Sequence, residues 1–224
     1  MLLRRRPARV ERALAEKAFA QTRYVLVVRV PRPIEVRIED IYLHLAGTTK
    51  PVMGFHITLL GPFLFHPPET PGQVATQPVF GENQNTPTSD FVSRVRSVCR
   101  NWEPFSVRLH GLGVFKGQND HLIYIQIAEP QTLIALHNEL LKAVEGLITP
   151  QDERYRKWCV TSYQPHVTLG LGLTDRELEE FLHTGTLHPF DESFEVSGLW
   201  LAQQAPNGPW QYITEFPLGT SPKT

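Results

Sequence analysis

The tetrapeptide His-[Ile/Val]-Thr-Leu occurs twice in this chain, at residues 56–59 and 166–169, roughly half the chain apart. From the chain's own residue frequencies one such tetrapeptide is expected about 0.01 times, so chance does not explain two. Side chains alternate along a β-strand, so each copy would place its histidine and threonine on one face and its two apolar side chains on the other. Two such strands, with their polar faces turned toward each other, would form a cleft with two imidazoles and two hydroxyls.

These polar side chains suit phosphoryl transfer. Histidine has an ordinary pKa of about 6.5, so at neutral pH one imidazole can be neutral while a second is protonated. The neutral one can take a proton from an attacking water, and the protonated one can give a proton to a departing ribose oxygen. Threonine hydroxyls can donate to the phosphate oxygens. The pattern predicts a phosphoesterase with the catalytic residues His56, Thr58, His166 and Thr168 and with no metal or cofactor.

Other readings of the motifs stay open. A single His-x-Thr on a strand is more often structural, with its imidazole bonded to a nearby carbonyl. A zinc site could also use two histidines, but neither tetrapeptide has a carboxylate or cysteine beside it. A nucleotide-binding module that does no chemistry is a third possibility, although such a module has no need for two proton-transfer groups.

The remaining sequence predicts an α+β protein with antiparallel sheet, because its strands come in hairpin-like pairs. Strands are expected at 24–30, 55–63, 105–110, 122–127, 165–171, 194–203 and 210–216, and helices at 7–21, 36–46, 89–102, 131–147 and 174–183. The last helix begins with a capping box at Thr174. We expect an N-terminal helical extension at 1–21, a single domain at 22–224, and a long polar loop at 64–88 within it.

Charge and composition limit the partners and the setting. The net charge of −1 argues against coating nucleic acid by bulk electrostatics, so a nucleic-acid partner would be gripped locally. No apolar run reaches the roughly 20 residues that cross a bilayer, and the N-terminus lacks the apolar core of a signal peptide. The two cysteines, Cys99 and Cys159, form no CxxC pair and are expected to be packing groups. We expect a cytoplasmic monomer with no membrane partner.

At the two motifs the chain resembles the two-histidine (2H) phosphoesterase superfamily, whose hallmark is a pair of H-x-[T/S]-x motifs. It looks closest to the 2′-5′ RNA ligase and RNA 2′,3′-cyclic phosphodiesterase branch. Three features carry this resemblance: Phe55 before the first motif, the glycine-rich turn at 111–115, and Tyr-Gln-Pro at 163–165 before the second. The resemblance implies a bilobal fold, in which two antiparallel sheets with pseudo-two-fold symmetry flank a central cleft and the helices lie outside.

The resemblance also implies an activity, namely opening a 2′,3′-cyclic phosphate on an RNA end or nucleotide, with 2′-5′ RNA ligation as a side activity. In that branch the first histidine is usually the acid and the second the base, which would make His56 the donor and His166 the base. The chain departs from typical members at Gly170, where many relatives place an arginine. The substrate therefore stays open, and a small cyclic nucleotide or an ADP-ribose cyclic phosphate is an alternative.

Four further residues are candidates for substrate binding. Phe115 and Lys116 lie at a glycine-rich turn, where a ring could stack on a base and an ammonium could meet a phosphate. Tyr163 precedes the second motif at an odd offset, so it could also be a packing group on the opposite face. His66 follows the first motif strand and could line the cleft. The other histidines show no partner pattern and are interpreted as ordinary: His44, His110, His121, His137, His183 and His188.

Overall fold

The computed structural model describes residues 21–42, 51, 53–66, 87–118, 121–151, 162–185 and 190–219. The expected helix at 7–21 therefore lies outside the described residues, apart from its last position, and so does Cys159. Of the expected loop at 64–88, residues 67–86 also lie outside them. The ends of that loop are regular structure, because the strand before it continues to Phe65 and the helix after it begins at Pro87.

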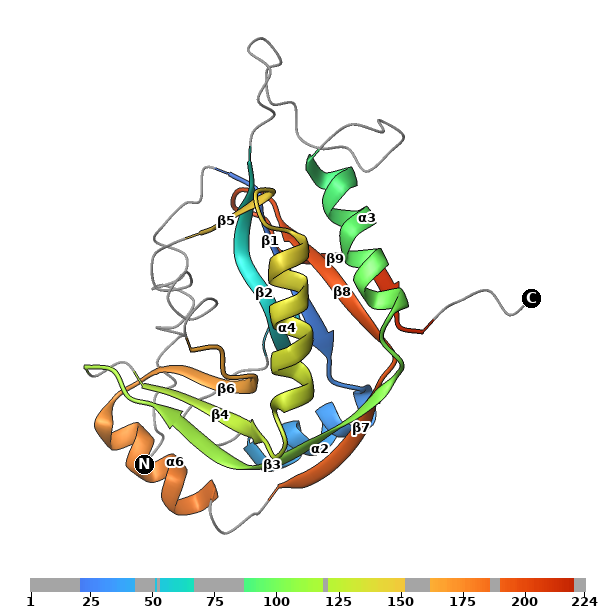
Figure 1. The fold of residues 1–224 in the computed structure, drawn as a ribbon. Coiled ribbons are helices and arrows are strands. Elements are labelled where there is room, and N and C mark those ends of the chain that lie inside the picture. The colour runs from blue at the N-terminus through green and yellow to red at the C-terminus, as the bar shows by residue number, and fades with distance from the viewer. Residues whose placement is uncertain are drawn as a thin grey trace.

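The described segments form an α+β fold, as expected (Figure 1). In chain order the elements are β1 (Arg23–Arg29), α2 (Arg32–Tyr42), β2 (His56–Phe65), α3 (Pro87–Arg100), β3 (Phe105–Phe115), β4 (His121–Ile127), α4 (Gln131–Ala143), β5 (Ile148–Pro150), β6 (His166–Leu173), α6 (Asp175–Gly185), β7 (Asp191–Val196), β8 (Gly198–Gln204) and β9 (Trp210–Pro217).

The strands form two antiparallel groups that meet at the motif strands. The order is β7-β3-β4-β6-β2-β1-β8-β9, with β5 paired to β2 off this path. We call β2-β1-β8-β9 lobe 1 and β6-β4-β3-β7 lobe 2. A single register pair, Ile57 with Val167, connects the lobes. The expected bilobal arrangement is confirmed, with the difference that this pair joins the two sheets into one curled sheet.

The two lobes repeat each other in detail. Val28 lies opposite Ile57 in lobe 1, and Ile125 lies opposite Val167 in lobe 2. Directly after each threonine the register slips in the same way. β2 uses three residues, 58–60, where β1 uses two, and β6 uses 168–170 where β4 uses two. A β-bulge at the same place in both motif strands shows that the pseudo-two-fold symmetry extends to local backbone geometry.

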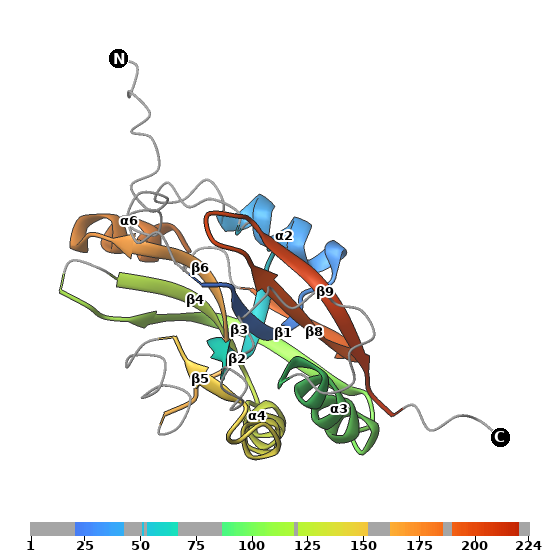
Figure 2. The same cartoon turned by 90° about the horizontal axis from the view of Figure 1, so that it is seen from above.

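The helices cover the outer sides of the lobes. Figure 2 shows α3 and α4 on one side of the molecule and α2 and α6 on the other. α4 packs against β2 and α3 against β9, so this pair covers lobe 1. α6 packs against β4 and β6, while α2 reaches β7 through the Arg37–Glu192 ion pair. α2 follows β1 of lobe 1 and contacts lobe 2, whereas α4 follows β4 of lobe 2 and packs on lobe 1.

The core is one apolar cluster that contains both motif strands. Ile57, Leu59 and Val167 are 0% exposed and Leu169 is 4% exposed, so the apolar half of each motif is buried as the alternation predicts. Cys99 also lies in this core as a free thiol, which confirms it as a packing group. Burial raises the pKa of that thiol to about 12.

Some element boundaries differ from those expected. The strand predicted at 194–203 is two strands, because the chain leaves lobe 2 at the end of β7 and enters lobe 1 with β8. α2 begins at Arg32 with Pro33 in its first turn, where a missing backbone N–H costs nothing. The expected turn at 111–115 is instead the second half of β3, which pairs with β4 as far as Phe115. The short strand β5 was not predicted. Among the described helices, none has the length and apolar character needed to span a membrane.

Candidate active site

The four polar motif residues lie on one face at the junction of the lobes. In both motif strands the histidine and threonine are half-buried and the residues between them are buried. Since β2 and β6 are antiparallel about the Ile57–Val167 pair, the register brings His56 beside Thr168 and Thr58 beside His166. The two histidines are diagonal neighbours in this antiparallel pair, and residues in that relation are about 7–8 Å apart in a regular sheet. The arrangement is a square of two imidazoles and two hydroxyls.

Both imidazoles are held in the same way. His56 Nδ1 lies 2.9 Å from the carbonyl oxygen of Gly54, and His166 Nδ1 lies 2.7 Å from that of Gln164. A carbonyl oxygen only accepts, so each Nδ1 carries the proton and donates it. Each Nε2 is therefore the atom that can exchange protons with a ligand. Among the described residues no protein group bonds either Nε2 or the hydroxyls of Thr58 and Thr168.

The charges around the two histidines differ. Burial is the main cause that lowers the pKa of both imidazoles below the ordinary value. The negative charge of Glu35 raises the pKa of His56 in part, whereas the positive charge of His56 lowers the pKa of His166 further. This second interaction also requires that the two imidazoles lie close together. The carboxylate of Glu35 thus favours the protonated form of His56, and no carboxylate of the described residues is among the groups that shift the pKa of His166.

Glu35 supports the backbone that holds His56. Its Oε1 accepts a hydrogen bond of 2.9 Å from the backbone N–H of Phe55, and its side chain is 13% exposed. Gly54 has a positive φ of 72°, and a Cβ there would overlap the Glu35 carboxylate. Glycine at 54 is therefore required for the carboxylate to reach this backbone and for the Gly54 carbonyl to face the imidazole.

Aromatic rings form the wall of the site in lobe 2. Tyr124 lies opposite Thr168 and is stacked on Phe115 at 4.5 Å between ring centroids. The centroid of the His166 ring lies 5.2 Å from that of Phe115 and 5.1 Å from that of Tyr124. Gln164 donates to the Tyr124 hydroxyl at 2.9 Å. A Cβ on Gly113 would overlap the Tyr124 ring, so glycine at 113 makes room for this wall.

A comparison with protein families shows to which family this chain belongs. The family model of the 2′-5′ RNA ligase superfamily matches residues 30–208, which include both motifs. The chain belongs to the 2′-5′ RNA ligase superfamily. The resemblance inferred from the motifs is therefore confirmed at the level of the family.

Curated relatives and solved structures agree with membership in the 2′-5′ RNA ligase superfamily. A protein of Bacillus pumilus (strain SAFR-032), whose name assigns it to the phosphoesterases, is 30% identical over 133 residues, 58% of this chain and 70% of its own. TT0787 of Thermus thermophilus has a TM-score of 0.56 at 18% identity, with 88% of this chain and 98% of that chain covered. E. coli LigT, solved with 3′-AMP, has a TM-score of 0.55 at 15% identity, with 89% and 99% covered. These two structures show the fold alone.

The structure brings only some of the expected substrate-binding residues to this superfamily site. Phe115 lies against the His166 ring, and Lys116 follows it as an exposed residue at the end of β3. His66 lies one residue beyond the opposite end of β2 from His56, about 30 Å along the strand, and bonds Thr149 at 2.5 Å. The structure therefore does not bring His66 to the paired histidines.

Tyr163 lies on the core side of the sheet, as its odd offset allowed. Its hydroxyl donates to the carbonyl of Thr58 at 2.8 Å, and its ring is stacked on that of His137 at 3.8 Å. His137, which sequence analysis interpreted as ordinary, is fully buried and donates from Nδ1 to the carbonyl of Leu59 at 2.7 Å. This pair therefore holds two successive carbonyls of the first motif, one of them at the bulge.

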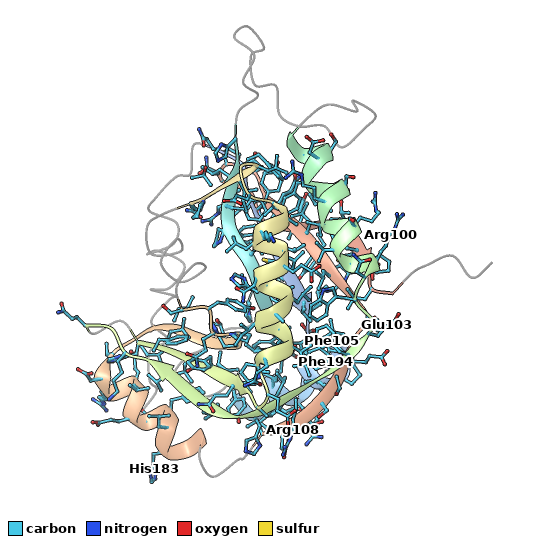
Figure 3. The ribbon with its side chains drawn as sticks, in the orientation of Figure 1. Arg100, Glu103, Phe105, Arg108, His183 and Phe194 are labelled. Atoms are coloured by element: carbon cyan, nitrogen blue, oxygen red, sulfur yellow. The ribbon has the colours of Figure 1, made fainter. Side chains whose placement is uncertain are left out.

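Several residues of the site were not found from the sequence. Alternation along 122–127 predicts that Tyr124 lies on the face of the strand opposite to the buried isoleucines. It does not predict which residues surround Tyr124 there. Glu35 has no local signal, because it reaches the site from a helix 20 residues away in sequence. In the part of the chain that the structure describes, no three His, Cys, Asp or Glu residues are grouped to hold a metal ion. His183 projects from α6 away from the body of the molecule (Figure 3).

Proposed function

We propose that this chain is a metal-independent phosphodiesterase that opens 2′,3′-cyclic phosphates on RNA ends or nucleotides, with 2′-5′ RNA ligation as a side activity. One observation carries the proposal. Two imidazoles from equivalent strands each donate Nδ1–H to a carbonyl two residues earlier and present Nε2 to the same face, each beside a threonine hydroxyl. Membership in a superfamily with phosphoesterases among its relatives supports the same class of chemistry.

In the proposed reaction His166 is the base and His56 the acid. His166 Nε2 takes a proton from a water molecule as the water oxygen attacks phosphorus. The bond from phosphorus to one ribose oxygen breaks, and His56 Nε2–H gives its proton to that oxygen. Charge that builds on the non-bridging oxygens is met by the hydroxyls of Thr58 and Thr168. The product is a ribose monophosphate with one free neighbouring hydroxyl.

The nucleotide class of substrate rests on further support. LigT of E. coli, which has the same fold, was solved with 3′-AMP and with NADP+. Phe115 lies against the His166 ring and is a candidate to contact the base of the nucleotide. The cytoplasmic setting and the monomeric state stay predictions.

The most direct test of substrate is product analysis. The purified protein is incubated with RNA that ends in a 2′,3′-cyclic phosphate, in the presence of EDTA, and the monophosphate isomer is identified. We expect turnover that EDTA does not change and a single isomer, because one ribose oxygen faces His56. Tight nucleotide binding without turnover across a panel of cyclic phosphates would instead favour a binding module.

A further inference from the structure

The polar face of lobe 1 carries a cation that the proposed reaction does not use. Arg29 lies directly opposite His56 in the β1–β2 pair, and its side chain is exposed. Opposed residues of an antiparallel pair project from the same face of the sheet. Arg29 therefore shares the face of the active site. The equivalent position in lobe 2, opposite His166, is the neutral Gln126.

Two aromatic rings set the direction of the Arg29 guanidinium. Its Cζ lies 5.1 Å from the centroid of the Trp200 ring on β8 and 4.6 Å from that of Tyr212 on β9. The two rings meet edge to face at 5.7 Å, and the Tyr212 hydroxyl donates to the carbonyl of Met53 at 2.8 Å. The guanidinium thus extends across lobe 1, away from β2, over rings that are themselves held in place.

Two carboxylates lie near Arg29, those of Glu35 and Glu215. Glu35 pairs with Arg32 at 3.3 Å, and Glu215 leans over Gly198, 3.4 Å from where a Cβ would lie. Within the described segments no carboxylate forms an ion pair with Arg29. Arg29 also hydrogen-bonds the Tyr212 hydroxyl and thereby lowers the pKa of Tyr212 in part. Because the Arg29 side chain is exposed and a guanidinium has five N–H donors, the remaining N–H groups can bind a phosphate.

The position of Arg29 identifies which phosphate this would be. The scissile phosphate belongs between His56 and His166, over β2 and β6. The guanidinium lies beside the Trp200 ring of β8 and the Tyr212 ring of β9, on the lobe-1 side of His56. Because His56 protonates the ribose oxygen, the ribose lies on the lobe-1 side of phosphorus, and the substrate continues from there over lobe 1.

We propose that Arg29, held by Trp200 and Tyr212, binds a second phosphate of the substrate, so that an oligonucleotide end is a better substrate than a cyclic mononucleotide. This inference rests on the proposed function and adds the substrate class to it. The linking phosphate of an RNA end and the pyrophosphate of an ADP-ribose cyclic phosphate offer the same chemistry. The experiment therefore includes a substrate of each kind, an RNA end and an ADP-ribose cyclic phosphate.

The test is built around two substrates that differ only in the charge of one group. The dinucleotide ApA with a terminal 2′,3′-cyclic phosphate is compared with the same molecule whose linking phosphate is a neutral methylphosphonate. Adenosine 2′,3′-cyclic phosphate, which lacks the second phosphate, and ADP-ribose 1″,2″-cyclic phosphate, which carries a pyrophosphate, are assayed beside this pair. We expect wild-type kcat/KM to be about tenfold higher on the charged dinucleotide than on the neutral one. Arg29→Gln should abolish that ratio. Arg96→Gln, an exposed arginine on α3, is the matched control and should keep it.

Each outcome decides one question. If Arg29→Gln retains the preference for the charged dinucleotide, or lowers kcat/KM equally on the two dinucleotides and the mononucleotide, the inference is wrong and the proposed function stands. In another outcome, Arg29→Gln lowers kcat/KM on ADP-ribose 1″,2″-cyclic phosphate but not on the dinucleotide. The second-phosphate site would then stand, and the claim that an oligonucleotide end is the preferred substrate would be wrong.

Failure of the proposed function gives a different result. If the wild-type protein turns over none of these substrates, the chemistry is wrong, and the second-phosphate site is decided by binding alone. The Kd of ApA with a terminal monophosphate, in the isomer that binds more tightly, should then rise about tenfold in Arg29→Gln, with no such rise for the methylphosphonate analogue. An equal Kd for the two analogues in wild type would overturn the site.

Discussion

At the scale of single residues, Glu35 distinguishes two histidines whose other contacts are alike. Both imidazoles donate Nδ1–H to a carbonyl, and burial lowers both pKa values. Only the pKa of His56 is raised by a neighbouring carboxylate, and the charge of His56 in turn lowers the pKa of His166. The charge of Glu35 therefore favours the protonated form of His56, which is the form that the proposed acid needs.

Replacing Glu35 by glutamine tests this assignment through the pH dependence of the rate. The amide oxygen of Glu35→Gln can still accept from the N–H of Phe55, but the charge that raises the pKa of His56 is gone. An acid must be protonated, so kcat/KM falls as pH rises through the pKa of His56. We expect this alkaline limb of the pH–kcat/KM profile to move to lower pH while the acidic limb stays in place.

Glu39→Gln is the matched control for that experiment. Glu39 shares Arg32 with Glu35 but is not among the groups that shift the pKa of His56. Its profile should match that of the wild type. Movement of the acidic limb in Glu35→Gln, with the alkaline limb unchanged, would reverse the roles of the two histidines.

At the scale of elements, two glycines of β3 have different reasons to be glycine. Gly113 faces the Tyr124 ring so closely that a Cβ would overlap it. Gly111 has nothing within 4 Å of such a Cβ but has a positive φ of 72°. The first is therefore a steric requirement of the aromatic wall, whereas the second is a backbone requirement of the irregular β3–β4 register.

Gly113→Ala should disturb both stability and substrate binding. The added methyl group must displace Tyr124, which Phe115 and Gln164 hold on its other sides. Overpacking of this kind costs about 1–3 kcal/mol in the free energy of unfolding. We also expect KM for the cyclic substrate to rise, because the Phe115 ring moves with Tyr124. Denaturant unfolding and steady-state kinetics measure the two effects.

Gly111→Ala is the comparison that separates strain from displacement of the wall. It should cost about 1–2 kcal/mol for the left-handed backbone and leave KM near the wild-type value. Wild-type stability and KM in Gly113→Ala would show that the wall does not depend on this glycine.

Elements with a strong local signal could be predicted from the sequence. The half-buried alternation of both motif strands is confirmed, and so is the capping box, in which the N–H of Thr174 donates to Glu177 at 2.8 Å. The division at Ser197 was missed, because the residues on both sides favour strand and only their partners differ. The bulges at Leu59 and Leu169 were missed for the same reason, since a register slip depends on the neighbouring strand.

At the scale of the whole molecule, the site exists because two equivalent strands meet at one pair of residues. The sequence predicted the facing polar surfaces of the motifs and the bilobal arrangement through the family resemblance. It could not predict which walls flank them, because Arg29, Trp200 and Tyr212 come together only through the pairing of β1, β8 and β9. His66 was wrongly predicted to line the cleft because it follows the first motif in sequence. It lies beyond the far end of β2 from His56, since β2 is ten residues long.

The central claim is that the two histidines act on one phosphodiester from opposite lobes without a metal. The most direct measurement is kcat on a 2′,3′-cyclic-phosphate dinucleotide in EDTA for wild type, His56→Ala, His166→Ala and the control His183→Ala. We expect each motif variant to lower kcat by about 10²–10⁴, as the loss of a general acid or base does, and the control to match wild type. Near-wild-type kcat in both motif variants would contradict the account.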